Sequence, residues 1–280
     1  MLLADIVHQP HAFANNCLHK ILGAGARTAF ILHGPGREFF DRFYDPKDGL
    51  YRGQASFIDV SWPERARPVG AYPAHFKVDD YLLLKAASTN ALYVKGLRVL
   101  SEAAKRLGRN EKALAWNKKE QQLQKAILEN LIAPDGRIAY YKDRHGTLSD
   151  RSEVLGTALP ILHDAVDPET GARALRQYPQ TAVGIPVIDP FFDTDGAYHN
   201  NRSWPFTDTF FLAAAEKALG ESQCAYNLAL LARVVKKDGF HELMDMRNGA
   251  VIGSGHHRAC ATMPDTLVAG AYRLVGEGAG

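Results

Sequence analysis

A helical hydrophobic period dominates this chain and constrains its fold more than any other feature. Apolar residues recur at helical spacing from Ser88 or Thr89, either of which would serve as N-cap, to Leu107. A second stretch with the same period runs from Asn110 to Leu131 and ends before a Pro-Asp-Gly turn. The short link between the two stretches predicts an antiparallel helical hairpin.

A second hairpin is expected further along the chain. Pro205 occupies a natural first helical position, Gly220 ends that helix, and Glu221 or Ser222 starts another that runs to about Lys237. Weaker helical patterns cover residues 5–22, 28–44, 152–163, 168–177 and 262–274. Strand-like pieces, at residues 137–141 and 183–188, are short and isolated. We therefore expect residues 1–280 to form a single all-α domain.

The segments between these helices hold the unusual residues. Residues 45–80, 135–150, 180–204 and 238–261 are long and rich in Gly, Pro and aromatic residues. Long loops in compact domains are usually functional. Helical hairpins arranged in a ring, with these loops at one end, would form an α/α toroid around a single pocket.

The composition excludes several functions. Of 280 residues, 46% are hydrophobic and 23% are charged, which are the proportions of a globular protein with a full core. The net charge is +2 and the basic residues form no stripe, which argues against a nucleic-acid partner. No apolar run reaches the roughly eighteen residues that span a membrane, and the start has no signal-peptide pattern. The default compartment is therefore the cytoplasm.

Neither a metal nor an organic cofactor is expected. The cysteines, Cys17, Cys224 and Cys260, are odd in number and lack CxxC spacing. His256 and His257 are adjacent, and adjacent side chains diverge on regular structure, so the pair is a poor metal site.

Two acidic residues in separate loops are the candidate catalytic pair. Asp59 follows Phe57 and Ile58, and an apolar shell would raise its pKa and keep it protonated as a general acid. Glu242 follows the helix stop at Gly239 and would remain ionised to hold a water as general base. Two carboxyl groups flanking a glycosidic bond suffice for its hydrolysis.

The candidate substrate-binding residues are aromatic and polar side chains in the same loops. Aromatic faces stack on sugar rings, while Asn, Arg and His orient hydroxyl groups. These residues are Arg52, Trp62, Tyr198, His199, Asn200, Arg202 and Trp204.

Four segments resemble the six-hairpin, (α/α)6-toroid glycoside hydrolases, and within them the mannosylglycerate hydrolase and processing α-glucosidase I group. They are YDPKDGLYRGQASFID at residues 44–59, STNALYVKGLRVLSEAAKRLG at 88–108, YHNNRSWPF at 198–206, and the final segment from Phe240. The resemblance implies an inverting hydrolase of an α-linked glycoside or small oligosaccharide. It places the general acid at Asp59 and the general base at Glu242.

Two departures from that pattern stand out. A complete toroid of this type has twelve helices, whereas the periodicity here gives about nine, so we expect the first helices to be missing. A truncated ring would leave apolar flanks uncovered and favour self-association, and a longer natural chain would allow a periplasmic or secreted location. The second departure is GSGHHRAC at residues 253–260, where the family commonly has a Gln and an aromatic residue after GSG.

Two other functions are compatible with these residues. A sugar epimerase or isomerase on the same fold would use paired histidines for proton transfer, with His199, His256 and His257 as candidates. A carbohydrate-binding remnant without catalysis would fit a truncated ring. Release of free sugar from α-glycosides distinguishes hydrolysis from both.

Overall fold

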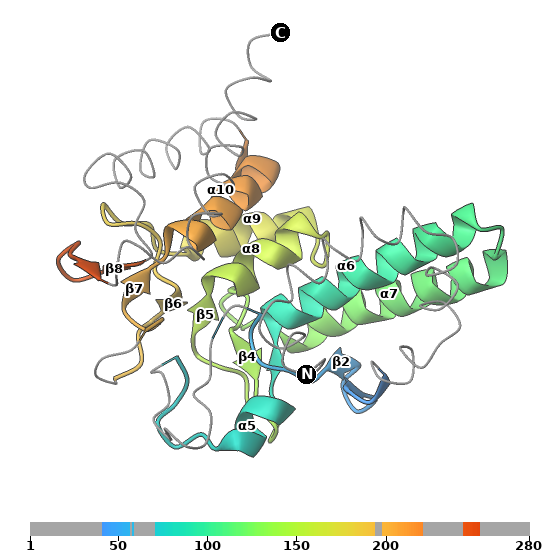
Figure 1. Cartoon of the computed structure of the whole chain (residues 1–280), viewed down its shortest axis with the longest axis horizontal. Helices are drawn as coiled ribbons and strands as arrows, with labels where there is room; N and C mark the ends of the chain where they lie inside the picture. Colours follow the sequence, from blue (N-terminus) through green and yellow to red (C-terminus); the bar gives the residue numbers. More distant parts are fainter. Residues whose placement is uncertain (1–40, 57, 59–70, 194–197, 221–242, 253–280) are drawn as a thin grey trace, which may run out of the picture.

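A computed structural model describes residues 41–56, 58, 71–193, 198–220 and 243–252 (Figure 1). The helices expected at 5–22, 221–237 and 262–274, and nearly all of that at 28–44, lie outside these residues. The described part is mainly helical. Its helices are α5 (Val78–Leu83), α6 (Ala87–Arg106), α7 (Asn110–Asn130), α8 (Val154–Leu162), α9 (Pro168–Gln177) and α10 (Pro205–Leu219).

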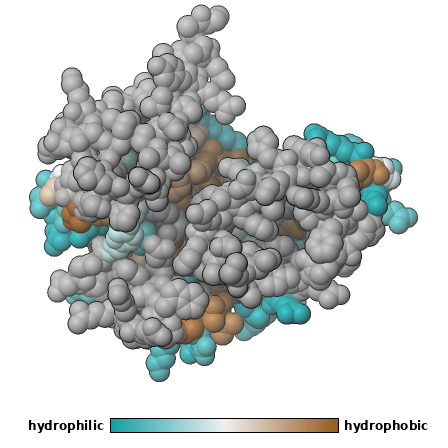
Figure 2. All heavy atoms as spheres, viewed as in Figure 1, coloured by the Kyte–Doolittle hydropathy of each residue, from teal (hydrophilic) through white to brown (hydrophobic). Residues whose placement is uncertain are grey.

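Helices α6 and α7 form the predicted antiparallel hairpin, the longest feature of the described chain (Figure 1). A hydrogen-bonded ion pair joins them, with Arg98 Nε 2.8 Å from Glu120 Oε1. Mostly hydrophilic residues cover the end of the hairpin farthest from the other helices (Figure 2). The predicted N-cap was wrong, because Ala86 occupies the N-cap position of α6, without a side-chain cap bond, and Ser88 and Thr89 lie inside the first turn.

Helices α6, α8 and α10 form a continuous inner row, since α8 packs against both of the others. Every residue of α8 from Val154 to Ile161 is buried, which explains its unbroken apolar sequence. Helix α7 covers α6, and α9 packs against α8 and α10. Within the described residues, no helix is long and apolar enough to cross a membrane.

Short strands pair at the end of the inner row where its helices begin. They form three antiparallel pairs, β1 with β2, β3 with β4 and β5 with β6, and a three-stranded sheet in the order β7-β8-β9. The strands are β1 (Tyr44–Asp45), β2 (Leu50–Tyr51), β3 (Lys85–Ala86), β4 (Tyr141–Lys142), β5 (Ser152–Glu153), β6 (Ile188–Asp189), β7 (Arg202–Ser203), β8 (Leu243–Asp245) and β9 (Val251–Ile252).

Strands β3, β5 and β7 lead into α6, α8 and α10, and each pairs with a strand that follows later in the chain. Further backbone bonds connect these strand pairs. The Tyr140 carbonyl accepts from the Ala87 amide at 3.1 Å, and the Tyr140 amide donates to the Arg151 carbonyl at 2.7 Å. Val187 repeats the pattern, accepting from Val154 at 2.9 Å and donating to Arg202 at 2.8 Å. This backbone ladder fixes the starts of the three inner helices relative to one another.

Candidate active site

The first turn of α6 holds the segment that leads to Asp59. The Asn90 side chain accepts from the Tyr51 amide at 2.8 Å and donates to the Tyr51 carbonyl at 2.9 Å. The Thr89 hydroxyl donates to the Gln54 carbonyl, and the Ser88 hydroxyl oxygen accepts from the Ser56 amide at 3.0 Å. Three consecutive side chains of α6 therefore bind three successive points of residues 51–56.

The same segment is also held from its other side. The Ala55 amide donates to the Tyr72 hydroxyl at 3.1 Å. Ile58, the residue directly before Asp59, is buried. The backbone that leads to the predicted general acid is thus fixed by side-chain hydrogen bonds and by core packing.

A carboxyl group that the sequence analysis did not single out lies at the start of α8. Glu153 is fully buried and caps the helix, accepting from the amides of Leu155 at 2.9 Å and Gly156 at 2.6 Å. Burial raises the pKa of Glu153 to about 7, and hydrogen bonds from these two amides and from the Ser88 side chain oppose that rise. Glu153 therefore joins the start of α8 to the start of α6.

Buried tyrosines surround Glu153. Burial raises the pKa of Tyr72, Tyr140 and Tyr178, and the negative charge of Glu153 adds to the rise at each of them. The Glu153 carboxylate therefore has neutral hydrogen-bond donors and phenol rings around it.

A second buried carboxyl group, also not predicted, lies in the first turn of α10. The Ser203 hydroxyl is 3.2 Å from Asp208 Oδ2, and the amide of Ile185 hydrogen-bonds the same side chain. Burial raises the pKa of Asp208 well above its ordinary value. One sequence pattern marks both Glu153 and Asp208: an acidic residue at or near the first residue of an apolar helix.

The run at residues 198–204 brings together five of the predicted substrate-binding residues. The His199 and Trp204 rings stack at 5.2 Å with an interplanar angle of 21°, and Tyr198 meets Trp204 edge-on at 4.8 Å. Trp204 is only 3% exposed, and its indole nitrogen donates to the Tyr198 carbonyl at 3.2 Å. Of the three rings, Tyr198 is the most accessible, with 37% exposed.

The polar members of this run bind the protein itself. Asn200 accepts from the Phe192 amide at 2.8 Å and donates to the Phe192 carbonyl at 2.7 Å. Arg202 donates to Asp245 Oδ2 at 2.9 Å across the β7–β8 pair. The run is therefore an ordered structure at the start of α10, and its contact with substrate stays a prediction.

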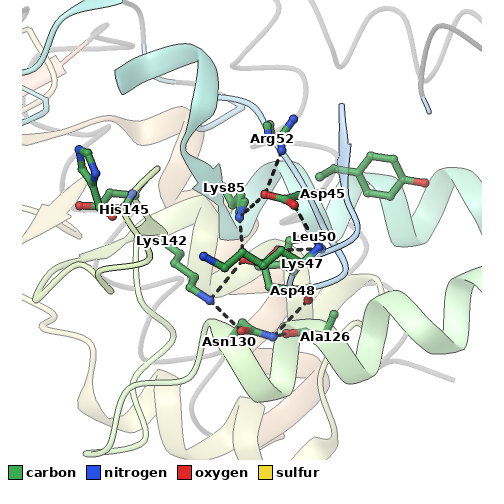
Figure 3. Close-up of polar contacts among 12 residues, drawn as sticks. Asp45, Lys47, Asp48, Leu50, Arg52, Lys85, Ala126, Asn130, Lys142 and His145 are labelled. Atoms are coloured by element: carbon green, nitrogen blue, oxygen red, sulfur yellow. Dashed lines mark hydrogen bonds and ion pairs between the residues drawn. The ribbon is translucent and has the colours of Figure 1, made fainter. Parts of the chain in front are cut away.

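Arg52 lies in a different polar cluster, between the β1–β2 hairpin and the start of α6 (Figure 3). Its guanidinium is 3.1 Å from Asp45 Oδ2. Lys85 Nζ is 2.8 Å from Asp45 and 2.6 Å from Asp48, and Lys142 Nζ is 3.3 Å from Asp48. A role for Arg52 in substrate binding stays a prediction.

The remaining predicted site residues, Asp59, Trp62 and Glu242, lie outside the described residues, as do His256 and His257. Glu242 directly precedes β8 in the sequence, and β8 pairs with the strand that leads into α10. In the described part of the chain, no group of three or more His, Cys, Asp or Glu side chains could hold a metal ion.

Comparison with known proteins gives the class of this structure. A chain described as a sialidase matches with a TM-score of 0.64 at 15% identity, covering 83% of this chain and 23% of its own. A GH63 mannosylglycerate hydrolase from Thermus thermophilus, in complex with Tris and D-glycerate, matches with a TM-score of 0.61 at 16% identity, covering 83% and 68%. A GH78 rhamnosidase from Bacillus sp. GL1 matches with a TM-score of 0.54 at 17% identity, covering 83% and 22%.

These likenesses define the fold as the (α/α)6 toroid of glycoside hydrolases, as the sequence predicted. This chain spans less than half the length of the first structures it matches. A comparison with curated proteins finds no match. Residues 59–258 match the family described as the mannosylglycerate hydrolase MGH1-like glycoside hydrolase domain, and the protein belongs to that family.

Proposed function

We propose that this protein hydrolyses an α-linked glycoside with inversion, using Asp59 as general acid and Glu242 as general base. The family match carries this proposal, because it begins at Asp59 and includes Glu242. In an inverting hydrolase one carboxylic acid protonates the leaving oxygen while a carboxylate activates water on the opposite face of the sugar. The two carboxyl groups would then be about 6.5–9.5 Å apart.

The surroundings of the two residues suit these roles. Asp59 follows a buried isoleucine at the end of a segment that α6 holds at three points, so the backbone that precedes it is fixed. Glu242 directly precedes a strand paired with the start of α10. Both carboxyl groups would thus be carried by backbone tied to the ladder of inner helix starts.

The substrate class we propose is a sugar in α-linkage to a small polar group. The Thermus thermophilus structures are described as a mannosylglycerate hydrolase in complexes with glucose and with Tris and D-glycerate. Tyr198 would supply an exposed aromatic face for a sugar ring, because it is the accessible ring of the 198–204 run. Arg202 and Asn200 would contribute to binding indirectly, by holding residues 198–204 in place, since both bind neighbouring backbone or side chains.

The test is a panel of α-mannosides, α-glucosides, trehalose and mannosylglycerate with the purified protein. We expect release of free sugar, and proton NMR of the first product should show the inverted anomer. Asp59→Asn and Glu242→Gln should each lower kcat by at least about 100-fold. Glu129→Gln is the matched control, because Glu129 is an exposed residue of α7.

Three outcomes would contradict the proposal. A retained anomer would exclude the inverting mechanism, and full activity in either variant would remove that residue from the pair. Binding of a sugar without its release would favour the non-catalytic alternative.

A further inference from the structure

Ser88 connects two parts of the molecule that are distant in sequence. Its hydroxyl oxygen accepts from the Ser56 amide at 3.0 Å, three residues before Asp59. The same side chain hydrogen-bonds the Glu153 carboxyl group at the start of α8. Ser88 and Glu153 are both fully buried, so water does not compete for these bonds.

Helix α6 does not need a serine at position 88 to form, and helix α8 does not need a glutamate at position 153. Ala86 occupies the N-cap position of α6 and makes no side-chain cap bond, so the Ser88 hydroxyl does not act as the cap and bonds outside the helix. The cap of α8 would be satisfied by Ser, Thr, Asp or Asn, which are the preferred N-cap residues and carry shorter side chains. A buried glutamate at this position costs desolvation, and what it adds beyond a cap is its contact with Ser88 on the neighbouring helix.

The packing around Glu153 fixes its carboxylate. A Cβ atom on Gly156 would lie 3.1 Å from Glu153 Oε2 and 3.5 Å from the Cβ of Ala87 in α6. The absence of a side chain at Gly156 thus lets the start of α6, the start of α8 and the carboxylate meet closely. The two amide donors leave this carboxylate little freedom to move away from Ser88.

We propose that Glu153 and Ser88 are positioning residues for the general acid, with Glu153 orienting the Ser88 hydroxyl and Ser88 holding the Ser56 amide. The role assigned to Asp59 in this inference rests on the proposed function. A hydroxyl that donates its proton to Glu153 keeps its oxygen lone pairs toward Ser56. Loss of either residue weakens the hold on Ser56, the anchored point nearest Asp59, while the bonds of Asn90, Thr89 and Tyr72 remain. An error of about 1 Å in the position of a catalytic group can cost on the order of 100-fold in rate.

The experiment measures anchoring and catalysis separately in the full chain. Hydrogen exchange by mass spectrometry on peptides covering residues 50–56 reports the Ser56 bond without any substrate. Ser88→Ala and Glu153→Gln should both raise exchange there by about 10-fold or more. With the best substrate of the panel, both should lower kcat by roughly 10-fold to 100-fold while KM changes less than about twofold.

The chain offers matched controls for both variants. Ser101 is a second serine of α6, partly buried, whose hydroxyl donates to the Ala113 carbonyl at 2.9 Å. Glu120 is a buried glutamate of α7 that pairs with Arg98. Ser101→Ala and Glu120→Gln should leave both the exchange of residues 50–56 and kcat unchanged.

The double variant Ser88→Ala/Glu153→Gln adds a further readout. If the two residues act in one chain of contacts, its loss in kcat should be close to that of Ser88→Ala alone rather than the product of the two losses. Independent structural damage would give the product and would overturn the inference.

The remaining outcomes test the anchoring of Ser56 and the positioning of the general acid separately. Unchanged exchange in Ser88→Ala would overturn the anchoring, whatever the activity. Faster exchange with unchanged kcat would overturn the positioning role. If the wild-type protein releases no sugar from any substrate, the proposed function fails, while the exchange data still decide whether Glu153 and Ser88 hold the segment.

Discussion

Two groups of carboxylates in this protein have pKa values shifted in opposite directions. Burial alone would raise the pKa of Asp45, but hydrogen bonds from Lys85, from the Lys47 amide and from Arg52 lower it to about 2. Burial also raises the pKa of Glu153, and the opposing donors, two amides and a serine, leave it at about 7. The two sites differ in both depth and partners: Glu153 is fully buried and is bonded by neutral donors, whereas the partly buried Asp45 binds the cations Lys85 and Arg52.

This difference separates a structural cluster from the candidate site. Around Asp45 and Asp48, charges of both signs neutralise one another and fasten the β1–β2 hairpin to the β3–β4 strand pair (Figure 3). At the starts of α8 and α10, Glu153 and Asp208 are bonded by neutral groups. Carboxyl groups whose pKa is strongly perturbed by burial cluster at functional sites, and structural ion pairs perturb pKa values as well.

The largest effect is expected from breaking the charged cluster. Lys85 is 4% exposed and contacts two carboxylates, so Lys85→Met would leave both with less compensation. We expect the free energy of unfolding to fall by about 3 kcal/mol, measured by urea denaturation. Lys125→Met is the control, because Lys125 forms only an exposed pair with Glu129 at 3.6 Å. Equal stability of Lys85→Met and wild type would mean that the cluster is dispensable.

An effect of about the same size concerns the pH dependence of stability at Glu153. Its pKa in the folded protein is about 7, above the ordinary 4.5, so the folded state binds more protons than the unfolded state between these values. The free energy of unfolding should therefore fall as pH rises through this window, by roughly 3 kcal/mol at about 1.4 kcal/mol per pKa unit. Glu153→Gln should remove this loss in denaturation curves at about pH 5 and about pH 8, whereas Glu120→Gln should retain it. An identical pH dependence in Glu153→Gln would exclude Glu153 as its source.

His163, at the other end of α8, should act in the opposite direction. Burial and the nearby charges of Lys95, Lys217 and Arg98 lower its pKa from 6.5 to about 4. The unfolded state binds the proton more readily, so stability present above pH 6.5 is lost as pH falls toward 4. Because the ring is only partly buried, we expect a loss of about 1–2 kcal/mol, and His163→Gln should be free of it in the same denaturation assay. A steeper loss in the variant would contradict this assignment.

The smallest effect is expected at Asp164, an exposed carboxylate that joins two helices. Its side chain is 55% exposed and pairs with Arg98 of α6 at 2.8 Å and Lys217 of α10 at 2.5 Å. Asp164 has a φ of 52°, which asparagine also tolerates, so Asp164→Asn removes the charge without backbone strain. Thermal unfolding should show a loss of no more than about 1 kcal/mol, reduced further by salt. A loss close to that of Lys85→Met would mean that the exposed ion pairs of Asp164 stabilise the protein as much as the charged cluster around Asp45 and Asp48 does.

Local signals explain what could be predicted from the sequence. Helix α9 has the predicted bounds, since Asp167 caps it by accepting from the Thr170 amide at 2.8 Å and Pro168 takes its first position. Helix α10 likewise begins at Pro205 and ends before Gly220. The family resemblance also gave the toroid, which the solved structures confirm.

Partners distant in sequence explain what could not be predicted. Ser88 and Thr89 have the chemistry of N-caps, but they bind the segment before Asp59 instead. A strand of two residues carries almost no pattern of its own, and β5 exists because β6, more than thirty residues later, lies beside it. The role of Glu153 could not be predicted from the sequence, because its burial and its contact with Ser88 depend on a neighbouring hairpin. The roles of Asp59, Glu242 and the other site residues stay predictions.

The backbone ladder also has a consequence for how this architecture tolerates change. Its links join the start of an inner helix to the segment that follows the same helical hairpin, and that segment to the residues that lead into the next inner helix, so they connect nearest neighbours in chain order. In repeat proteins such connectivity makes stability a sum of unit and nearest-neighbour terms, so that disturbance spreads from unit to adjoining unit. Substitutions around Tyr140 should then disturb α6 and α8 first and α10 last. The same modularity lets the loops at the helix starts diverge in sequence while the ring that carries them persists.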